Sequence, residues 1–284
     1  DSLSAALEEC QRAARRGYKA AKTNLLETAD AIRAAAQALD ESLARIEKSK
    51  ARTNSVSGDL RQQLANVVRE LELLQTSAEQ KLEHKRQRLD RFSLTLFGRT
   101  MSGKSTLMEI LTRGDGTSIG TGAQRTTRDV RSYSWNGLDV TDVPGIAAFE
   151  GAEDETLAYE AAAQADLVVF LITDDAPQPA EAECLARVRR LGKPIIGVCN
   201  VKTAVDDPDD LLLFLRKPEK PFNESRLNGI VEQFHTFADS HMPGTRVPFL
   251  ATHLRARYLA GRPDYAKHRL ALRTASHFDT VESR

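Results

Sequence analysis

The 284-residue chain has 40 lysine and arginine side chains and 40 aspartate and glutamate side chains, so its formal net charge is zero. This balance argues against a generally basic nucleic-acid binder, and the length allows one large domain or two ordinary ones. No segment approaches the roughly 18 consecutive apolar residues of a membrane span. The three cysteines lack metal-ligand spacing, so we expect a reduced, cytosolic setting. Because the sequence begins with Asp1 and ends at Arg284 without a clear helix cap, we expect the natural chain to extend beyond both ends.

Residues 1–91 have the composition of helices, with no proline and abundant alanine, leucine, glutamate, lysine and arginine. Apolar residues recur there in alternating steps of four and three, which predicts two helices that each have a heptad seam. The first seam comprises Leu25, Ala29, Ile32, Ala36, Leu39, Leu43 and Ile46. The second comprises Leu60, Leu64, Val67, Leu71, Leu74, Ala78 and Leu82. A break at Thr53–Gly58, followed by Asp59 as an N-cap, predicts an antiparallel helical hairpin.

The role of this hairpin stays open at the level of the sequence. The apolar stripes pack the two helices together in one interpretation, and form a lever that faces a protein partner or a membrane surface in the other. The basic segment Lys81–Arg91 also contains Glu83 and Asp90. We interpret it first as a solvated face and second as a contact for phosphate or lipid.

The segment Gly98–Thr106 reads GRTMSGKST and fits the phosphate-binding P-loop pattern GxxxxGK[ST]. A predicted strand, Phe92–Phe97, precedes it, and the apolar run Leu107–Leu111 predicts a helix after it. Gly98 allows the sharp turn, and the backbone N–H groups of the loop and of the helix N-terminus attract an anion. Lys104 is expected to reach the phosphates, and the Ser105 hydroxyl to ligate Mg²⁺.

Strands and helices alternate after the P-loop, which is typical of an α/β fold with a mostly parallel, doubly wound sheet. The hairpin signal Asn136–Gly137 connects two of the strands. The expected strands are Val130–Trp135, Leu138–Asp142, Asp166–Thr173, Lys193–Asn200 and Val247–Ala251. The expected helices lie within 146–164, 177–191 and 225–240.

Two further segments have open interpretations. The apolar run Asp207–Leu215 predicts a short helix packed on the sheet, or an insert that faces a partner or a membrane. After Gly261 we expect one helix that returns toward the N-terminal hairpin, or a terminal tail. The expected domains are therefore a helical hairpin over 1–91, a nucleotide-binding domain over 92–262 and a C-terminal helix over 263–284.

Asp142 ends a predicted strand, and Gly145 follows in a DxxG pattern. A carboxylate at this position holds Mg²⁺ from the side opposite Ser105, and the Gly145 N–H faces a γ-phosphate. The preceding segment Gln124–Val130 contains Thr126 and Thr127, and a threonine hydroxyl there completes the Mg²⁺ shell. We expect Thr127 to have this role, with Thr126 as the second candidate.

With these motifs the chain resembles the P-loop GTPases of the branch that contains the Era and tRNA-modification GTPases, septins and dynamins. The N-terminal helical segment is similar to that of bacterial dynamin-like proteins. The resemblance implies binding and Mg²⁺-dependent hydrolysis of GTP to GDP and phosphate. It implies catalytic roles for Lys104, Thr127 and Gly145, and metal ligation by Ser105, Thr127 and Asp142. The nucleotide-binding residues that it implies are Gly98, Thr100, Met101, Ser102, Gly103, Lys104, Ser105, Thr106, Asn200, Lys202, Ala251 and Thr252.

The sequence departs from the family pattern at three places. The guanine-reading motif Asn-Lys-x-Asp is replaced by Asn200-Val-Lys202-Thr, so these residues either read a base or form a polar strand end. Ile146 follows Gly145, where some GTPases have a water-orienting glutamine, and this implies slow intrinsic hydrolysis. Met101 stands where cation-activated relatives have asparagine, and a thioether is a poor ligand for K⁺, so we expect no potassium activation by that route.

The motifs and the resemblance leave three candidate functions open. The first is a slow GTPase that couples nucleotide state to the helices, as a switch or in a dynamin-like assembly. The second is a nucleotide-gated interaction module with negligible hydrolysis, and the third is an ATPase or non-selective NTPase. The partners expected are GTP and GDP, a second copy through the nucleotide-binding domain, and a protein or a peripheral membrane surface through the hairpin; nucleic acid is not indicated.

Overall fold

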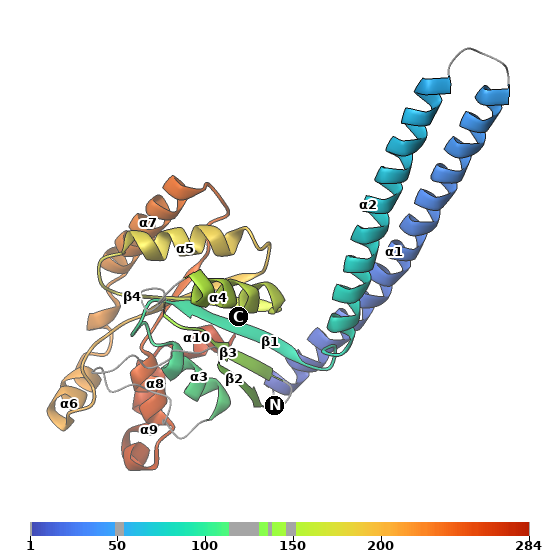
Figure 1. Ribbon diagram of the computed structural model, residues 1–284. Helices are drawn as coiled ribbons and strands as arrows, with labels where there is room; N and C mark the ends of the chain where they lie inside the picture. Colours follow the sequence, from blue (N-terminus) through green and yellow to red (C-terminus); the bar gives the residue numbers. More distant parts are fainter. Residues whose placement is uncertain (1, 49–53, 114–130, 136–137, 146–151, 284) are drawn as a thin grey trace. The chain divides into compact units, whose positions relative to one another are not determined.

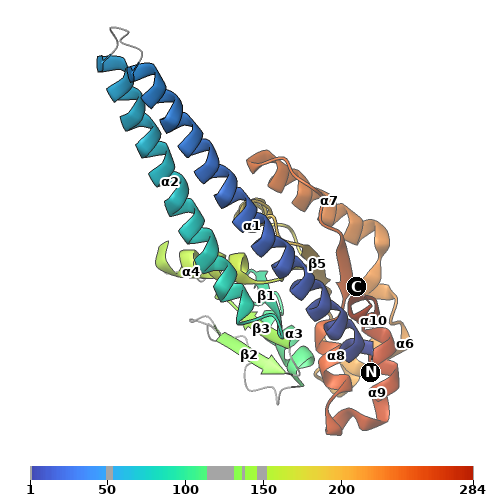
Figure 2. The same cartoon turned by 90° about the vertical axis from the view of Figure 1, so that its right-hand side faces the viewer.

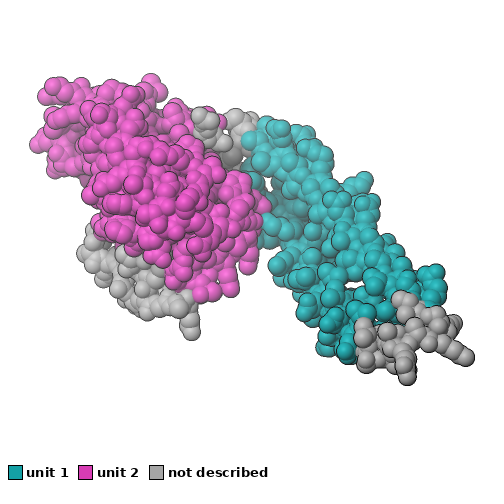
Figure 3. All heavy atoms as spheres, turned by 90° about the horizontal axis from the view of Figure 1, so that it is seen from above, with its two compact units in different colours: residues 1–92 teal, residues 93–284 magenta. Residues whose placement is uncertain are grey.

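The computed structural model describes residues 2–48, 54–113, 131–135, 138–145 and 152–283. The chain divides into two compact units, Asp1–Phe92 and Ser93–Arg284, which are coloured separately in Figure 3. The division falls one residue after the domain boundary expected at 91. No helix in the described ranges is both long and apolar enough to cross a membrane.

The first unit is an antiparallel hairpin of two long helices, α1 (Ser2–Lys48) and α2 (Asn54–Arg86), which lie side by side in Figures 1 and 2. Leu7, Ala29 and Leu43 of α1 are buried. An ion pair between Asp40 and Arg61, with a separation of 3.5 Å, links the two helices. The expected break at Thr53–Gly58 is shorter than predicted, because α2 begins at Asn54.

The seam of α2 differs from the predicted one. The less exposed residues are Arg61, Leu64, Val68, Leu71, Gln75, Ala78 and Leu82, which again alternate in steps of three and four. Leu60, Val67 and Leu74 are exposed. The helix has adjacent apolar positions on both sides of its seam, so the heptad pattern alone does not decide which of them faces α1. On α1, Leu39 is likewise exposed, whereas Leu25, Ala29, Ile32, Ala36 and Leu43 lie in the seam.

The second unit has a six-stranded sheet in the order β2-β3-β1-β4-β5-β6. β2 and β3 pair as an antiparallel hairpin, and the pairs β1–β4, β4–β5 and β5–β6 are parallel. The strands are β1 (Phe92–Gly98), β2 (Arg131–Trp135), β3 (Leu138–Asp142), β4 (Leu167–Thr173), β5 (Ile195–Asn200) and β6 (Phe249–Thr252). The expected α/β class and its mostly parallel sheet are confirmed.

Helices cover both faces of this sheet (Figure 1). One face packs on α4 (Ala152–Gln164), α5 (Pro179–Arg189) and α7 (Glu224–His241), around a core that includes Phe97, Phe170 and Phe234. The other face is covered by α3 (Lys104–Thr112) and α8 (Leu254–Ala260). Because the parallel strands β4 and β5 are buried between these layers, their sequences are nearly continuous apolar runs. β1 is buried as well, but its apolar residues alternate with Ser93 and Thr95.

The segment expected to be a short helix on the sheet is α6 (Pro208–Arg216), capped by the Asp207 carboxylate. It packs on α8 and α9 rather than on the sheet, and buries Leu211 and Phe214 in a small second core. Short 3₁₀ turns occupy Lys220–Phe222 and Pro263–His268.

The residues after Gly261 form α9 (Arg269–Ala275) and α10 (Asp279–Glu282) instead of the single C-terminal helix that we expected. They belong to the second unit, where Leu272 and Ala275 complete the small core with α6 and α8. This grouping differs from the expected separate segment, because Leu272 and Ala275 are buried by contact with α6 and α8.

Candidate functional site

The P-loop connects β1 to α3 and turns at two glycines in the left-handed region, Gly98 with φ 147° and Gly103 with φ 103°. A Cβ atom on Gly98 would lie 2.4 Å from the Leu171 carbonyl oxygen, and one on Gly103 would lie 2.6 Å from Nδ2 of Asn200. Only glycine fits either position, since both the backbone angle and the space exclude a side chain. The loop is therefore held close to β4 and to the end of β5.

Lys104 is buried at the first position of α3, beneath the loop. Its Nζ donates hydrogen bonds to the carbonyl oxygens of Gly98, at 3.0 Å, and Arg99, at 2.9 Å. Burial lowers the pKa of Lys104, while the nearby Asp142 carboxylate favours its charged form. The arrangement holds a cation against the inner side of an anion-binding loop.

Ser105 and Asp142 lie in contact although 37 positions separate them in the chain. The Ser105 Oγ donates to Oδ2 of Asp142 at 2.9 Å, and Asp142 is buried at the end of β3. A hydroxyl and a carboxylate oxygen side by side suit Mg²⁺, which favours few protein ligands together with phosphate oxygens and water. Within the described ranges, no group of three His, Cys, Asp or Glu side chains could hold a metal ion.

Gly145 is buried against the P-loop. A Cβ atom there would lie 2.4 Å from the backbone nitrogen of Thr100, so the DxxG segment and the loop are in direct contact. Thr106 lies in the first turn of α3, and Ser102 is buried. Thr126, Thr127 and Ile146 lie outside the described residues.

Asn200, at the end of β5, bridges two loops. Its Nδ2 donates to the Ser102 carbonyl oxygen at 3.0 Å, and its Oδ1 accepts the Leu254 N–H at 3.2 Å. Lys202 is exposed, and its backbone N–H donates to Oδ1 of Asp174 at 2.9 Å. Thr203 occupies the position of the family's guanine-reading aspartate, which is three residues after the asparagine.

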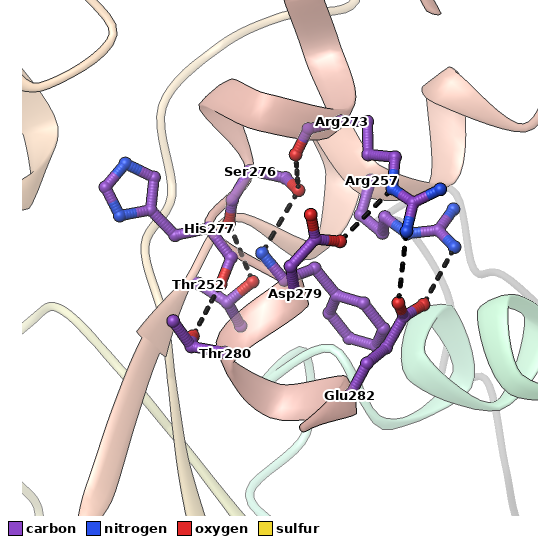
Figure 4. A network of polar contacts seen from close by, with 9 residues as sticks. Thr252, Arg257, Arg273, Ser276, His277, Asp279, Thr280 and Glu282 are labelled. Carbon is purple, nitrogen blue, oxygen red and sulfur yellow. Dashed lines mark hydrogen bonds and ion pairs between the residues drawn. The ribbon is translucent and has the colours of Figure 1, made fainter. Parts of the chain in front are cut away.

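The loop after β6 is fixed by the C-terminal turn (Figure 4). The Thr252 hydroxyl and the His253 backbone N–H both donate to the Ser276 carbonyl oxygen, at 2.8 and 2.9 Å. Ala251 precedes them and is half-buried. The hydroxyl proton of Thr252 is therefore engaged within the protein.

His253 is buried, in contrast to the exposed position suggested by its place after a strand. Its Nδ1 accepts the Ala256 N–H at 3.3 Å as the N-cap of α8. Its Nε2 lies 2.9 Å from the Thr203 carbonyl oxygen and donates to it when the ring is neutral. Burial lowers the pKa of His253, which favours this neutral form.

Ion pairs hold the C-terminal helices together beside this loop. Glu282 of α10 accepts from Arg257 of α8 and from Arg273 of α9, at 3.0 and 3.4 Å, and Arg273 also pairs with Asp279 at 3.1 Å (Figure 4). The network joins three helices around the turn that contains Ser276. It stabilises the turn that holds Thr252.

A charged cluster next to the P-loop was not expected from the sequence. Arg99, the second residue of the loop, donates to the side chains of Thr173 and Asp175 at the end of β4. Its Nε also lies 3.7 Å from the buried Glu181 carboxylate at the start of α5. The signal available in the sequence was the pair Asp174-Asp175 directly after a buried strand, since strand ends meet at one edge of a parallel sheet.

Comparison with known proteins agrees with this geometry. Residues 93–201, from β1 to the residue after β5, match the family model described as 50S ribosome-binding GTPase. The match covers less than half of the chain. No curated protein matches the sequence.

Solved structures with detectable similarity have low sequence identity. A variant of Era from Aquifex aeolicus bound to GDP·AlF4⁻ is 19% identical, with a TM-score of 0.42, over 67% of this chain and 54% of that one. Era in complex with MgGDPNP and part of 16S ribosomal RNA is 16% identical, with a TM-score of 0.42, over 68% and 55%. The bacterial selenocysteine-specific elongation factor EF-Sec is 16% identical, with a TM-score of 0.38, over 69% and 29%.

The chain thus spans about half the length of the Era structures that it matches. The sheet order, the P-loop and the matched segment agree on one fold. The second unit has the α/β fold of a P-loop GTPase domain, and the helices α1 and α2 precede it in the chain.

Proposed function

We propose that this protein binds GTP with Mg²⁺ and slowly hydrolyses it to GDP and phosphate. The observation that carries the proposal is the contact between Ser105 and Asp142, at 2.9 Å, directly beside the buried Lys104. It supplies two oxygen ligands and one cation at the N-terminus of α3, where a triphosphate is neutralised. The match of residues 93–201 to a GTPase family model supports the choice of nucleotide.

Lys104 would leave its two carbonyl partners and donate to phosphate oxygens. Exchange of neutral acceptors for charged ones strengthens its hydrogen bonds and compensates the desolvation that lowers its pKa. Ser105 and Asp142 would hold Mg²⁺, with Thr127 as a further ligand. The ion supplies charge neutralisation on the phosphates.

The close approach of Gly145 to Thr100 supports a nucleotide-dependent switch. The Gly145 N–H is positioned next to the loop that would hold the γ-phosphate, and a triphosphate would add a contact there that a diphosphate lacks. We propose that this difference in contacts is coupled to the helical hairpin, in a switch or a dynamin-like assembly. A second copy bound through the nucleotide-binding domain, and a protein or membrane surface bound through the hairpin, are further parts of the proposal.

Thr203 favours a second candidate function, that of a non-selective NTPase. A carboxylate accepts hydrogen bonds from both N–H groups on the guanine edge, whereas a threonine offers a single hydroxyl that also donates. The Thr203 hydroxyl therefore distinguishes guanine from adenine less strongly than a carboxylate would. A third candidate is a nucleotide-gated interaction module with negligible hydrolysis, which Ile146 favours because its side chain cannot orient water.

Titration of labelled GTP and ATP analogues with Mg²⁺ tests the proposal, on wild type and on Lys104→Ala. We expect wild type to prefer GTP, and binding to fall at least about 100-fold in Lys104→Ala, since one charge-assisted contact to phosphate is lost in a desolvated site. Lys267→Ala is the control, because that side chain is exposed and lies outside the residues proposed to bind nucleotide. Equal affinity for GTP and ATP would favour the non-selective NTPase, and no release of phosphate would favour the interaction module.

Unchanged binding in Lys104→Ala would contradict nucleotide binding at this loop. Thermal unfolding of the variant provides the matching control for folding. The buried lysine is desolvated, so replacement by alanine is expected to leave the midpoint close to that of wild type.

A further inference from the structure

The helical hairpin has a row of large apolar side chains that its own two helices do not cover. Leu60, Val67 and Leu74 are 47%, 53% and 66% exposed. They are spaced by seven residues on α2, so they form one straight ridge about 20 Å long. We call these three residues the ridge.

A second surface lies beside it on α1. This helix has no charged residue along the side formed by Thr28, Ala31, Ala35, Ala38 and Ser42, which we call the alanine face. The hydroxyls of Thr28 and Ser42 donate to the carbonyl oxygens of Asn24 and Ala38, each at 2.7 Å. Burial of this face would therefore leave no hydroxyl donor unsatisfied.

The ridge and the alanine face lie on the same side of the hairpin. Each residue of an α-helix advances by about 100°. Viewed along each helix from its N-terminus to its C-terminus, the ridge is rotated by about 70° from the α2 seam and the alanine face by about 110° from the α1 seam. Both rotations have the same direction. Because the two helices run antiparallel, equal senses of rotation point to one common side.

Charged contacts between the helices mark the opposite side. The ion pair of Asp40 with Arg61 bridges α1 and α2 there, and the charge of Lys22 acts on the Glu83 carboxylate. The same helical geometry places these four side chains away from the ridge. The hairpin is thus apolar on one side and charged on the other.

We propose that this apolar side binds the same side of a second copy of the chain, so that two hairpins form a four-helix bundle. A two-fold axis that runs between the two copies, parallel to the long axis of the hairpins, places the ridge of each copy over the alanine face of the other. Large side chains then enter the space left by small ones, as in the cores of such bundles. A two-fold interface needs a self-complementary patch, and a ridge beside a groove is one.

The dimensions of this surface fit a stable dimer. The 33 residues of α2 are about 50 Å long at 1.5 Å per residue. With a width of two helices, the face would bury on the order of 800 Å² per partner, which is the standard size of a specific interface. A membrane surface fits less well, since helices that bind anionic lipid are flanked by lysine and arginine. The charges around the ridge are mixed instead: Asp59 and Glu70 lie beside it, and Lys81 continues its spacing of seven residues.

The first test is the mass of the full-length protein in solution without nucleotide, measured by light scattering over the micromolar range. We expect twice the 31.4 kDa of one chain. In Leu74→Glu the dimer should dissociate about 100-fold more readily, because one buried leucine is lost and a carboxylate enters the interface. Leu73→Glu is the matched control: Leu73 is 64% exposed, but it points away from the ridge side.

The second test reports the register. The Asp40–Arg61 ion pair shows which residues of α1 and α2 lie at the same height along the hairpin. In the proposed bundle, Ala35 of one copy is therefore at the same height as Val67 of the other copy, and beside it. A Cys10→Ser, Ala35→Cys, Val67→Cys variant should form a disulfide-linked dimer on oxidation. Within one hairpin the helix axes are about 8–10 Å apart, too far for this bridge. The control pair Leu26→Cys with Leu73→Cys, in the same Cys10→Ser background, should not cross-link.

Three outcomes would overturn the proposal. The first is a monomer at every concentration, and the second is a dimer whose affinity is unchanged in Leu74→Glu. The third is a monomer that floats with vesicles of phosphatidylcholine and phosphatidylserine and loses this property in Leu74→Glu, which would assign the ridge to lipid. All measurements are made without nucleotide, so their result does not depend on the proposed GTPase activity.

Discussion

Asn200 links parts of the site that are distant in the chain, because Ser102 lies 98 positions before it and Leu254 lies 54 positions after it. Its side chain donates to the P-loop at Ser102 and accepts from Leu254 at the start of α8. It is buried, and Gly103 packs directly against its amide. One side chain thus fixes the distance between the phosphate loop and the segment expected to contact the base.

Asn200→Ala should weaken nucleotide binding by about 10- to 100-fold, because two loops lose their shared partner. It should also lower the free energy of unfolding by about 1–3 kcal/mol, since the Ser102 carbonyl and the Leu254 N–H are left without this bond in a buried place. Calorimetric titration and urea unfolding measure the two effects. Asn200→Asp separates them, as it keeps the acceptor for Leu254 but loses the donor to Ser102; equal effects of both variants would contradict the bridging role.

Met101 is exposed and has a left-handed backbone, with φ 65°. This conformation costs most side chains about 1 kcal/mol, and asparagine tolerates it better. Met101→Asn should therefore raise the free energy of unfolding by about 0.5–1 kcal/mol, as measured by urea unfolding.

The same variant should gain stimulation of hydrolysis by potassium over sodium, because it gains a side-chain oxygen where the wild type has a thioether. Met101→Ala is the control, with neither the oxygen nor the relief of strain. If wild type and Met101→Ala are both stimulated by potassium, the ion binds elsewhere.

At the scale of elements, two glycines with opposite surroundings test how tightly the sheet is packed. Gly197 lies in β5, where an added Cβ atom would lie 2.6 Å from the Phe249 ring and 2.8 Å from the Pro248 carbonyl oxygen. Gly229 lies inside α7 with nothing within 4 Å of the added atom. Gly197→Ala should destabilise the protein by about 1–3 kcal/mol through overpacking, and Gly229→Ala should stabilise it by about 0.5–1 kcal/mol through helix propensity.

Thermal unfolding of the two variants decides this prediction, because the same chemical change is made at both sites. If Gly197→Ala is neutral, β6 moves away from β5 without cost, and the packing of Phe249 on the sheet is looser than its contacts indicate. If Gly229→Ala also destabilises, α7 has a close neighbour at that position.

The strands of the second unit were predictable because local signals and packing agree there, whereas α8, α9 and α10 were not predicted as such. Gly98 and Asn200 end strands that are buried on both faces, Asp142 ends a strand whose burial alternates, and Lys104 begins α3, so a motif marks each of these boundaries. The seam of α2 was predicted in part: Leu64, Leu71, Ala78 and Leu82 lie in it, but the pattern does not choose between adjacent positions such as Val67 and Val68, and only the partner helix selects Val68. The roles of Arg99 and His253 also depend on segments distant in sequence, which periodicity does not report.

At the scale of the whole molecule, two buried histidines make stability depend on pH. Burial lowers the pKa values of both His235 and His253. The folded state disfavours protonation of both side chains. Their contribution to the free energy of unfolding is therefore complete above the pKa of an unfolded-state histidine, about 6.5, and is lost as the pH falls toward the lower pKa values of the folded state. The free energy of unfolding should therefore fall as the pH drops below about 6.5, by at most about 1.4 kcal/mol per histidine and pH unit.

His253→Asn isolates one of these contributions. Asparagine is a good N-cap, so α8 keeps its cap while the titrating group is removed. Denaturant unfolding at several pH values should give a shallower dependence for this variant than for wild type. Parallel curves would mean that His253 titrates alike in the folded and unfolded states.

The hydrogen bonds from Thr252 and His253 to Ser276 have a consequence for synthesis of the chain. A ribosome releases the polypeptide from its N-terminus, so β1 to β6 emerge before the turn that contains Ser276. Until that turn appears, the loop after β6 lacks its anchor, although the P-loop is already present. We expect nascent chains that stop before residue 276 to hold nucleotide through phosphate contacts alone, and selection of the base to begin only when the last helices have folded.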